Sequence, residues 1–140
     1  MLDIISYLQE IEKLDILINN KIIEVEQWKA LALKTTSVLT PDKVQSSGSQ
    51  QKMAEAIEKY IDIEHEINES IDRFYAIKSE ILSKIEQLPA DEYDMLHRVY
   101  VQYIPIKVVA DLCDRSYSWA IKLHNKAIDH LQELLSKEST

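Results

Sequence analysis

The sequence predicts an all-α protein in which a long helical hairpin, or coiled coil, is followed by a small helix-turn-helix domain. The 140 residues include one Gly and three Pro, while Leu, Ile, Glu, Lys and Ala dominate, so few residues are available for tight turns. Apolar residues also recur at steps of three and four through most of the chain, which is the period of a helix stripe. Both observations favour helices throughout.

The first predicted helix covers about 30 residues. Its apolar stripe consists of Ile4, Leu8, Ile11, Leu14, Ile18, Ile22, Val25 and Trp28. The following segment, about residues 35–51, collects Ser, Thr, Gln and the only Gly, and it contains Thr40-Pro41. Because Pro biases the residue before it out of the helical region, this segment predicts a loop.

A second long helix is predicted from Lys52, and its stripe follows a heptad pattern. The heptad positions are Ile57, Tyr60, Glu64, Ile67, Ile71, Phe74, Lys78, Ile81, Ile85 and Leu88. A pattern held over more than four heptads indicates a coiled-coil seam, with the first helix or a second copy of the chain as the partner. We expect a homo-oligomer, with a dimer favoured, held by Ile57, Ile67, Ile71, Phe74 and Ile81.

Leu88-Pro89 ends this helix and predicts a domain boundary, with residues 1–88 forming the hairpin and residues 89–140 a second domain. The second domain holds a short helix after Pro89, another at about residues 106–113 and a longer one at about residues 117–135. Asp114 falls where the intervening turn needs a left-handed residue, and Ser116 is a predicted N-cap.

Charge and composition exclude several classes of protein. The net charge is −8, of which −6 falls in residues 1–88 and −2 in residues 89–140, which argues against a general nucleic-acid coat protein. Cys113 is the only cysteine, the histidines lack ligand spacing, and phosphate-binding Gly loops and nucleophile elbows are missing from the sequence. We therefore expect no enzyme activity, metal or cofactor. The sequence has neither the pattern of a signal peptide nor that of a membrane span, so we expect a cytoplasmic protein.

One segment of the second domain is basic, although the protein as a whole is acidic. Residues 115–128 contain no acidic residue, although acids flank the window on both sides. A short helix, a turn and a longer basic helix are the arrangement by which a second helix enters the DNA major groove. The residues predicted to contact double-stranded DNA are Arg115, Tyr117, Ser118, Trp119, Lys122 and Lys126.

Several segments of the chain are similar to a known protein family. They are residues 85–89 (IEQLP), 109–112 (VADL) and 123–131 (LHNKAIDHL), together with Tyr93, Leu96 and Ser116. Over roughly the last 55 residues the chain resembles region 4 of sigma-70-type factors. The segments SSGS (46–49), KMA (52–54) and IEHEI (63–67) are similar to those of phage and prophage proteins of Gram-positive bacteria, grouped loosely with late regulators of the RinA and ArpU type. The resemblance implies a transcription regulator in a bacterial host cell, with RNA polymerase as a further partner.

The chain departs from the sigma pattern on the predicted recognition helix. Tyr117, Ser118, Trp119 and Lys122 stand where sigma factors often place several Arg, so the usual −35 promoter specificity is not implied. Nothing resembles the promoter-melting or polymerase-core-binding regions. Two alternatives stay open at this point: a DNA-packaging component such as a small terminase subunit, which would form a ring, and a helical interaction protein that does not bind DNA.

Overall fold

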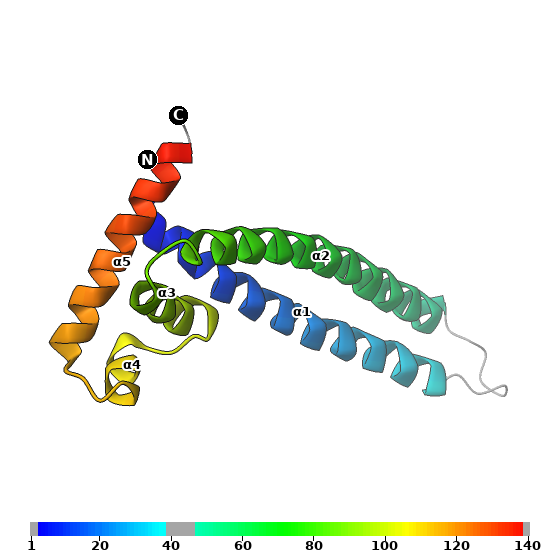
Figure 1. Cartoon of the computed structure of the whole chain (residues 1–140). Helices are drawn as coiled ribbons and strands as arrows, with labels where there is room; N and C mark the ends of the chain where they lie inside the picture. The colour runs from blue at the N-terminus through cyan, green and yellow to red at the C-terminus, as the bar shows by residue number, and fades with distance from the viewer. Residues whose placement is uncertain (1–2, 39–46, 139–140) are drawn as a thin grey trace. The chain divides into compact units, whose positions relative to one another are not determined.

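The structure, a computed structural model, describes residues 3–38 and 47–138, and all elements in these ranges are helices. In chain order they are α1 (Ile4–Val38), α2 (Ser47–Ile85), α3 (Ala90–Leu96), the single π-helical turn η1 (His97–Val101), α4 (Ile106–Leu112) and α5 (Tyr117–Glu138) (Figure 1). The predicted all-α class is confirmed for this part of the chain. Packing separates two compact units. We call residues 15–73 the hairpin unit, and residues 1–14 with 74–140 the core unit.

The predicted loop at about residues 35–51 is too long at both ends. Helix α1 continues to Val38 and α2 already begins at Ser47, while residues 39–46 lie outside the described part of the chain. Ser and Thr disfavour a helix only weakly, so composition alone is a poor guide to where a helix ends. A Cβ atom added at Gly48 would meet no atom within 4 Å. The packing around Gly48 therefore does not require a glycine at this position.

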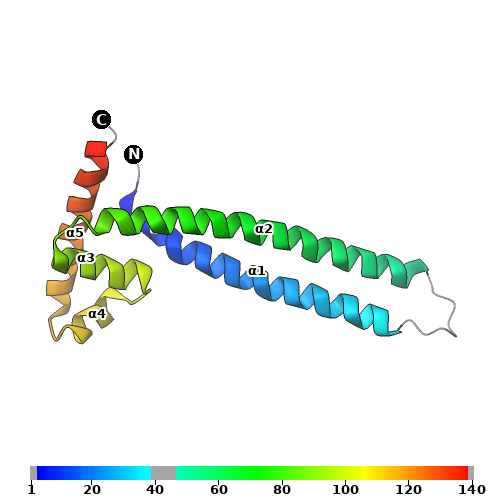
Figure 2. The same cartoon turned by 45° about the vertical axis from the view of Figure 1, so that its right-hand side comes forward.

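In the hairpin unit, α1 and α2 lie side by side and run in opposite directions (Figures 1 and 2). Two ion pairs follow this antiparallel register: Lys21 contacts Glu66 at 2.6 Å, and Lys29 contacts Glu64 at 3.1 Å. Exposed pairs of this kind contribute little stability. The buried side chains between the helices are Ile18, Val25, Ala32, Ala56 and Ile67.

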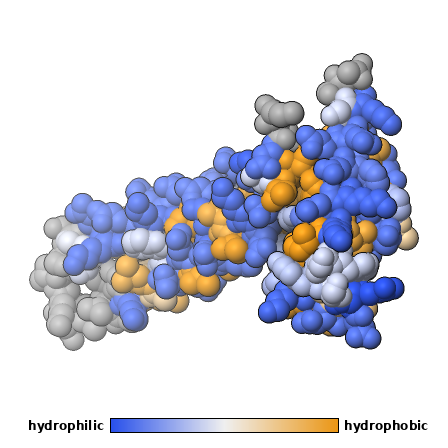
Figure 3. Space-filling model, turned by 90° about the vertical axis from the view of Figure 1, so that its left-hand side faces the viewer, coloured by the Kyte–Doolittle hydropathy of each residue, from blue (hydrophilic) through white to orange (hydrophobic). Residues whose placement is uncertain are grey.

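The same unit leaves much apolar surface uncovered. Its large exposed apolar side chains are Ile16, Leu17, Ile22, Ile23, Leu31, Leu33, Ile61 and Ile71. Apolar patches interrupt the polar surface over the paired long helices (Figure 3). A shallow groove of about 340 Å³ lies between the two helices, with Leu33, Ile57 and Tyr60 among its lining residues. Surface of this kind is more typical of a contact region than of an isolated hairpin.

The core unit buries one large cluster assembled from distant parts of the chain. Its fully or nearly buried members are Ile4, Leu8 and Ile11 of α1, Ile81 and Ile85 of α2, and Leu88, Leu96, Tyr100, Ala127 and Leu131. The unit therefore takes residues from both sides of the predicted boundary at 88/89. Each buried Leu or Ile contributes about 1.5–3 kcal/mol by leaving water, so these contacts are the main stabilising force here.

A second, smaller cluster lies where α5 packs against α3 and α4. Met95, Val109, Ala110 and Ala120 are buried in it. The chain enters α4 through Tyr103, whose φ of 62° is unusual for a bulky residue and strains the backbone there. The aromatic ring of Tyr103 packs against the larger cluster.

Candidate nucleic-acid interface

The connection between α4 and α5 is a tight turn with a defined hydrogen-bond pattern. The Arg115 N–H donates to the carbonyl of Ala110 at 2.9 Å, and the Asp114 N–H donates to the carbonyl of Asp111 at 3.1 Å. Asp114 itself is left-handed, with φ of 54°. These are the two bonds and the one left-handed residue of a Schellman motif. The prediction that Asp114 takes the left-handed position is confirmed.

Helix α5 starts directly after this turn, and Ser116 caps it. The Trp119 N–H donates to Ser116 Oγ at 3.0 Å, which confirms the predicted N-cap. The Arg115 guanidinium lies over the Trp119 ring at 5.6 Å, so the first cation of the basic window is held against α5. A capped helix start also directs unpaired N–H groups and a partial positive charge toward solvent.

Five of the six predicted contact residues are exposed, and Trp119 is half-buried against the smaller cluster. Ser118, Lys122 and Lys126 are four residues apart and share one face of α5, since residues at this spacing lie above one another on a helix. Tyr117 lies outside this row. The structure thus brings three of the predicted polar contacts together on a single exposed strip of α5.

The three cations of the window have no carboxylate partner within the described residues. Arg115, Lys122 and Lys126 are exposed and form no salt bridge there. Beyond Lys126 the same face of α5 changes from basic to acidic, because the exposed residues Asp129 and Glu133 follow on it. The basic strip is therefore limited to about the first ten residues of α5.

Two polar contacts, which the sequence did not reveal, connect α5 to η1 and to α3. Tyr100 OH lies 2.6 Å from His124 Nε2, and both residues are buried. Glu92, only 1% exposed, lies 2.5 Å from His130 Nδ1 through one of its carboxylate oxygens. Sequence patterns assign polar residues to the surface, and the partners are 24 and 38 residues apart, so local spacing carries no signal of either contact.

Burial determines the protonation state of the first pair. Desolvation lowers the pKa of His124 below its usual value, and the hydrogen bond to Asn125 opposes this only in part. Desolvation also raises the pKa of Tyr100 to about 12, with a smaller contribution from the negative charge of Asp3. A neutral imidazole therefore faces a protonated phenol near neutral pH.

The residues predicted to hold an oligomer are divided between the interior and the surface. Ile67 and Ile81 are buried within the single chain, Ile57 and Phe74 are half-buried, and Ile71 is exposed. Ile67 and Ile81 are consequently occupied by intramolecular packing.

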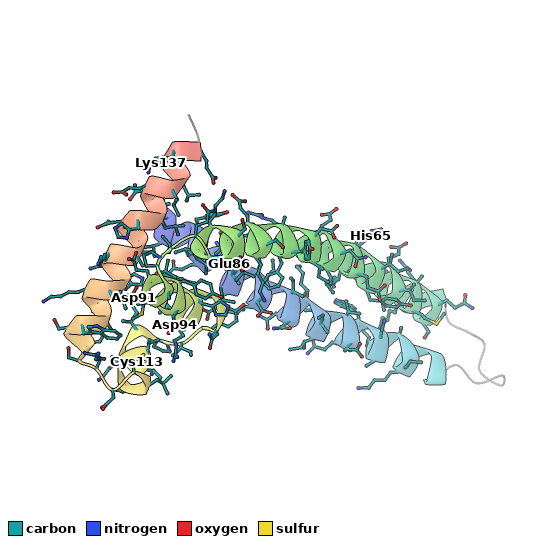
Figure 4. The ribbon with its side chains drawn as sticks, viewed as in Figure 1. His65, Glu86, Asp91, Asp94, Cys113 and Lys137 are labelled. Atoms are coloured by element: carbon teal, nitrogen blue, oxygen red, sulfur yellow. The ribbon has the colours of Figure 1, made fainter. Side chains whose placement is uncertain are left out.

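The described residues give no support for a metal site or for a membrane-spanning helix. No group of three His, Cys, Asp or Glu side chains there could hold a metal ion. Cys113 is a half-buried free thiol at the end of α4 (Figure 4). Residues 3–38 and 47–138 also contain no helix with the length and apolar character that crossing a bilayer requires. No family model, curated protein or solved structure matches the chain.

Proposed function

We propose that the chain is a sequence-specific DNA-binding transcription regulator of phage type, in which α4, the turn and α5 form a helix-turn-helix. The observation that carries the proposal is the exposed strip of Ser118, Lys122 and Lys126 on a capped helix that follows a tight turn. In such motifs the second helix lies in the major groove, with its N-terminal residues at the base edges. Arg115 and the two lysines reach phosphates or bases, and α4 supports them from behind.

The charge distribution fits selective rather than general binding. The cations of the strip are unpaired in the described residues, whereas Asp129 and Glu133 border it and the whole chain carries a net charge of −8. Negative charge opposes the sequence-independent attraction to DNA, so affinity has to come from a cognate site. We expect weak binding to random DNA.

The proposal includes a homodimer formed through the hairpin unit as a coiled coil or bundle. Exposed apolar residues such as Ile23 (55% exposed) and Leu33 (70% exposed) support it, because contact with a second copy would remove them from water. A dimer would also present two recognition helices to two half-sites.

Selection from a random DNA pool by the purified full-length chain tests the proposal. The expected result is an enriched site, which is a palindrome if the protein acts as a dimer, and whose enrichment is strongly reduced when Lys122 and Lys126 are both replaced by Ala. The matched control is the double variant Lys52→Ala, Lys59→Ala, which removes the same charge from exposed positions of α2. Equal loss in both variants would refute the assignment of the site to α5.

A second candidate, a helical interaction protein without DNA affinity, is favoured by the acidic half of α5 and by the apolar hairpin surface. The same selection separates the two functions. Failure of the wild-type chain to enrich any sequence at low salt, where attraction to phosphate is strongest, would favour the interaction protein.

A further inference from the structure

Asn125 lies on the proposed recognition strip but was not among the predicted contacts. It is exposed, three residues after Lys122 and seven after Ser118, so it shares their face of α5. It is also the one carboxamide in the acid-free window of residues 115–128. A carboxamide can read a base edge with one donor and one acceptor, which a lysine cannot do.

The amide of Asn125 is held by the buried network beneath it. Asn125 Oδ1 lies 3.3 Å from His124 Nδ1, and His124 Nε2 lies 2.6 Å from Tyr100 OH. An amide oxygen only accepts hydrogen bonds, so Nδ1 carries the proton and donates it to Oδ1. The unprotonated Nε2 then accepts from the Tyr100 hydroxyl. The chain of donors runs from η1 through the core to the surface of α5.

The protonation states of His124 and Tyr100 agree with hydrogen-bond donation from Tyr100 to His124 and from His124 to Asn125. Because desolvation lowers the pKa of His124, the ring is neutral and has one N–H, as the two contacts require. Burial raises the pKa of Tyr100 to about 12, so the phenol keeps the proton that it donates.

We propose that Asn125 reads an adenine in the major groove, and that His124 and Tyr100 are positioning residues that orient its amide. This inference rests on the proposed DNA-binding function. Oδ1 has two lone pairs, so it can accept from His124 and from the adenine N6 amino group together, while Nδ2 donates to adenine N7. Fixing the amide beforehand reduces the ordering entropy that the contact would otherwise lose on binding.

The test measures base preference position by position. A site is first selected with the wild-type chain, and binding is then compared for all four bases at each position. Asn125→Ala should reduce the preference for adenine about ten-fold at one base pair, as expected for loss of a bidentate contact, and leave the other positions and the salt dependence unchanged. Asn125→Asp, which has only acceptors, should shift the preference at that base pair toward cytosine, whose N4 amino group is a donor.

The positioning role is tested with Tyr100→Phe, which removes only the hydroxyl. Preference at the same base pair should weaken while Asn125 is still present. The matched control is Gln132→Ala, which deletes an exposed carboxamide further along α5 and should change no base preference. Thermal melting of each variant identifies any that are not folded, and Asn125→Ala, at an exposed position, gives the decisive result.

A uniform loss of affinity for all bases with Asn125→Ala, or no loss, would overturn the adenine contact. An effect of Asn125→Ala without any effect of Tyr100→Phe would overturn the positioning role. If the wild-type chain selects no site, the DNA-binding proposal fails first, and that outcome is visible before any variant is compared.

Discussion

Removing the two strip lysines should change the salt dependence of DNA binding by an amount that follows from the exposed cations. Arg115, Lys122 and Lys126 are exposed and have no carboxylate partner in the described residues, which gives three cations per chain and six per proposed dimer. Each phosphate neutralised adds about −0.9 to the slope of log affinity against log salt, so a dimer should show about −5. The double variant Lys122→Ala, Lys126→Ala retains one cation per chain and should show about −2.

The slopes expected for the wild type and the double variant differ enough to be distinguished in a salt titration. Between about 50 and about 200 mM salt, a slope of −5 reduces affinity about a thousand-fold, whereas a slope of −2 reduces it about fifteen-fold. Fluorescence anisotropy on a labelled copy of the selected site measures both. The control is Lys52→Ala, Lys59→Ala, which changes the net charge equally and should keep the wild-type slope. Equal slopes for the wild type and the Lys122, Lys126 variant would show that these lysines do not contact phosphate, and would remove them from the proposed DNA interface.

Three further predictions concern stability and assembly. Asp114→Gly should raise the free energy of unfolding by about 0.5–1 kcal/mol, because Gly adopts the left-handed conformation without steric penalty, and a lower midpoint in urea would contradict this. Below the ordinary His pKa of 6.5, the unfolded chain binds a proton that buried His124 resists, so stability present above pH 6.5 is lost as the pH falls toward the lowered pKa of the folded state. Urea unfolding of the wild type should therefore lose more stability between neutral and mildly acidic pH than His124→Gln does, and identical losses would exclude His124 as the cause. Ile23→Asp with Leu33→Asp should convert a dimer into a folded monomer in light scattering at micromolar concentration, and a monomeric wild type would refute the dimer.

The helices could be predicted from sequence because their signals are local. The short helix after Pro89, the Ser116 cap and the left-handed Asp114 each depend on neighbouring residues, and the structure confirms all three. Helix ends near the predicted loop were misplaced because Ser and Thr residues permit a helix when neighbouring turns continue it.

The buried polar residues could not be predicted in this way. Glu92 and His124 look like surface positions until their partners, His130 and Tyr100, are brought to them by the packing of α5. The same reason explains why Asn125 was missed as a candidate, since only the buried His124 beside it distinguishes it from an ordinary exposed amide. The local charge window, by contrast, was sufficient to select the strip of Lys122 and Lys126.

The large cluster of the core unit has a consequence for how the chain folds. Its members include Leu8 and Leu131, so contacts of very high sequence separation close the core. Such contacts raise the contact order, and the entropy lost in closing so long a loop slows folding. During synthesis the apolar face of Ile4, Leu8 and Ile11 can pack against Ile81 and Ile85 of α2, but its cover is complete only when α5 has left the ribosome. Antiparallel pairing of α1 with α2 shortens that loop in advance, which makes early hairpin formation the step that protects the nascent chain from aggregation.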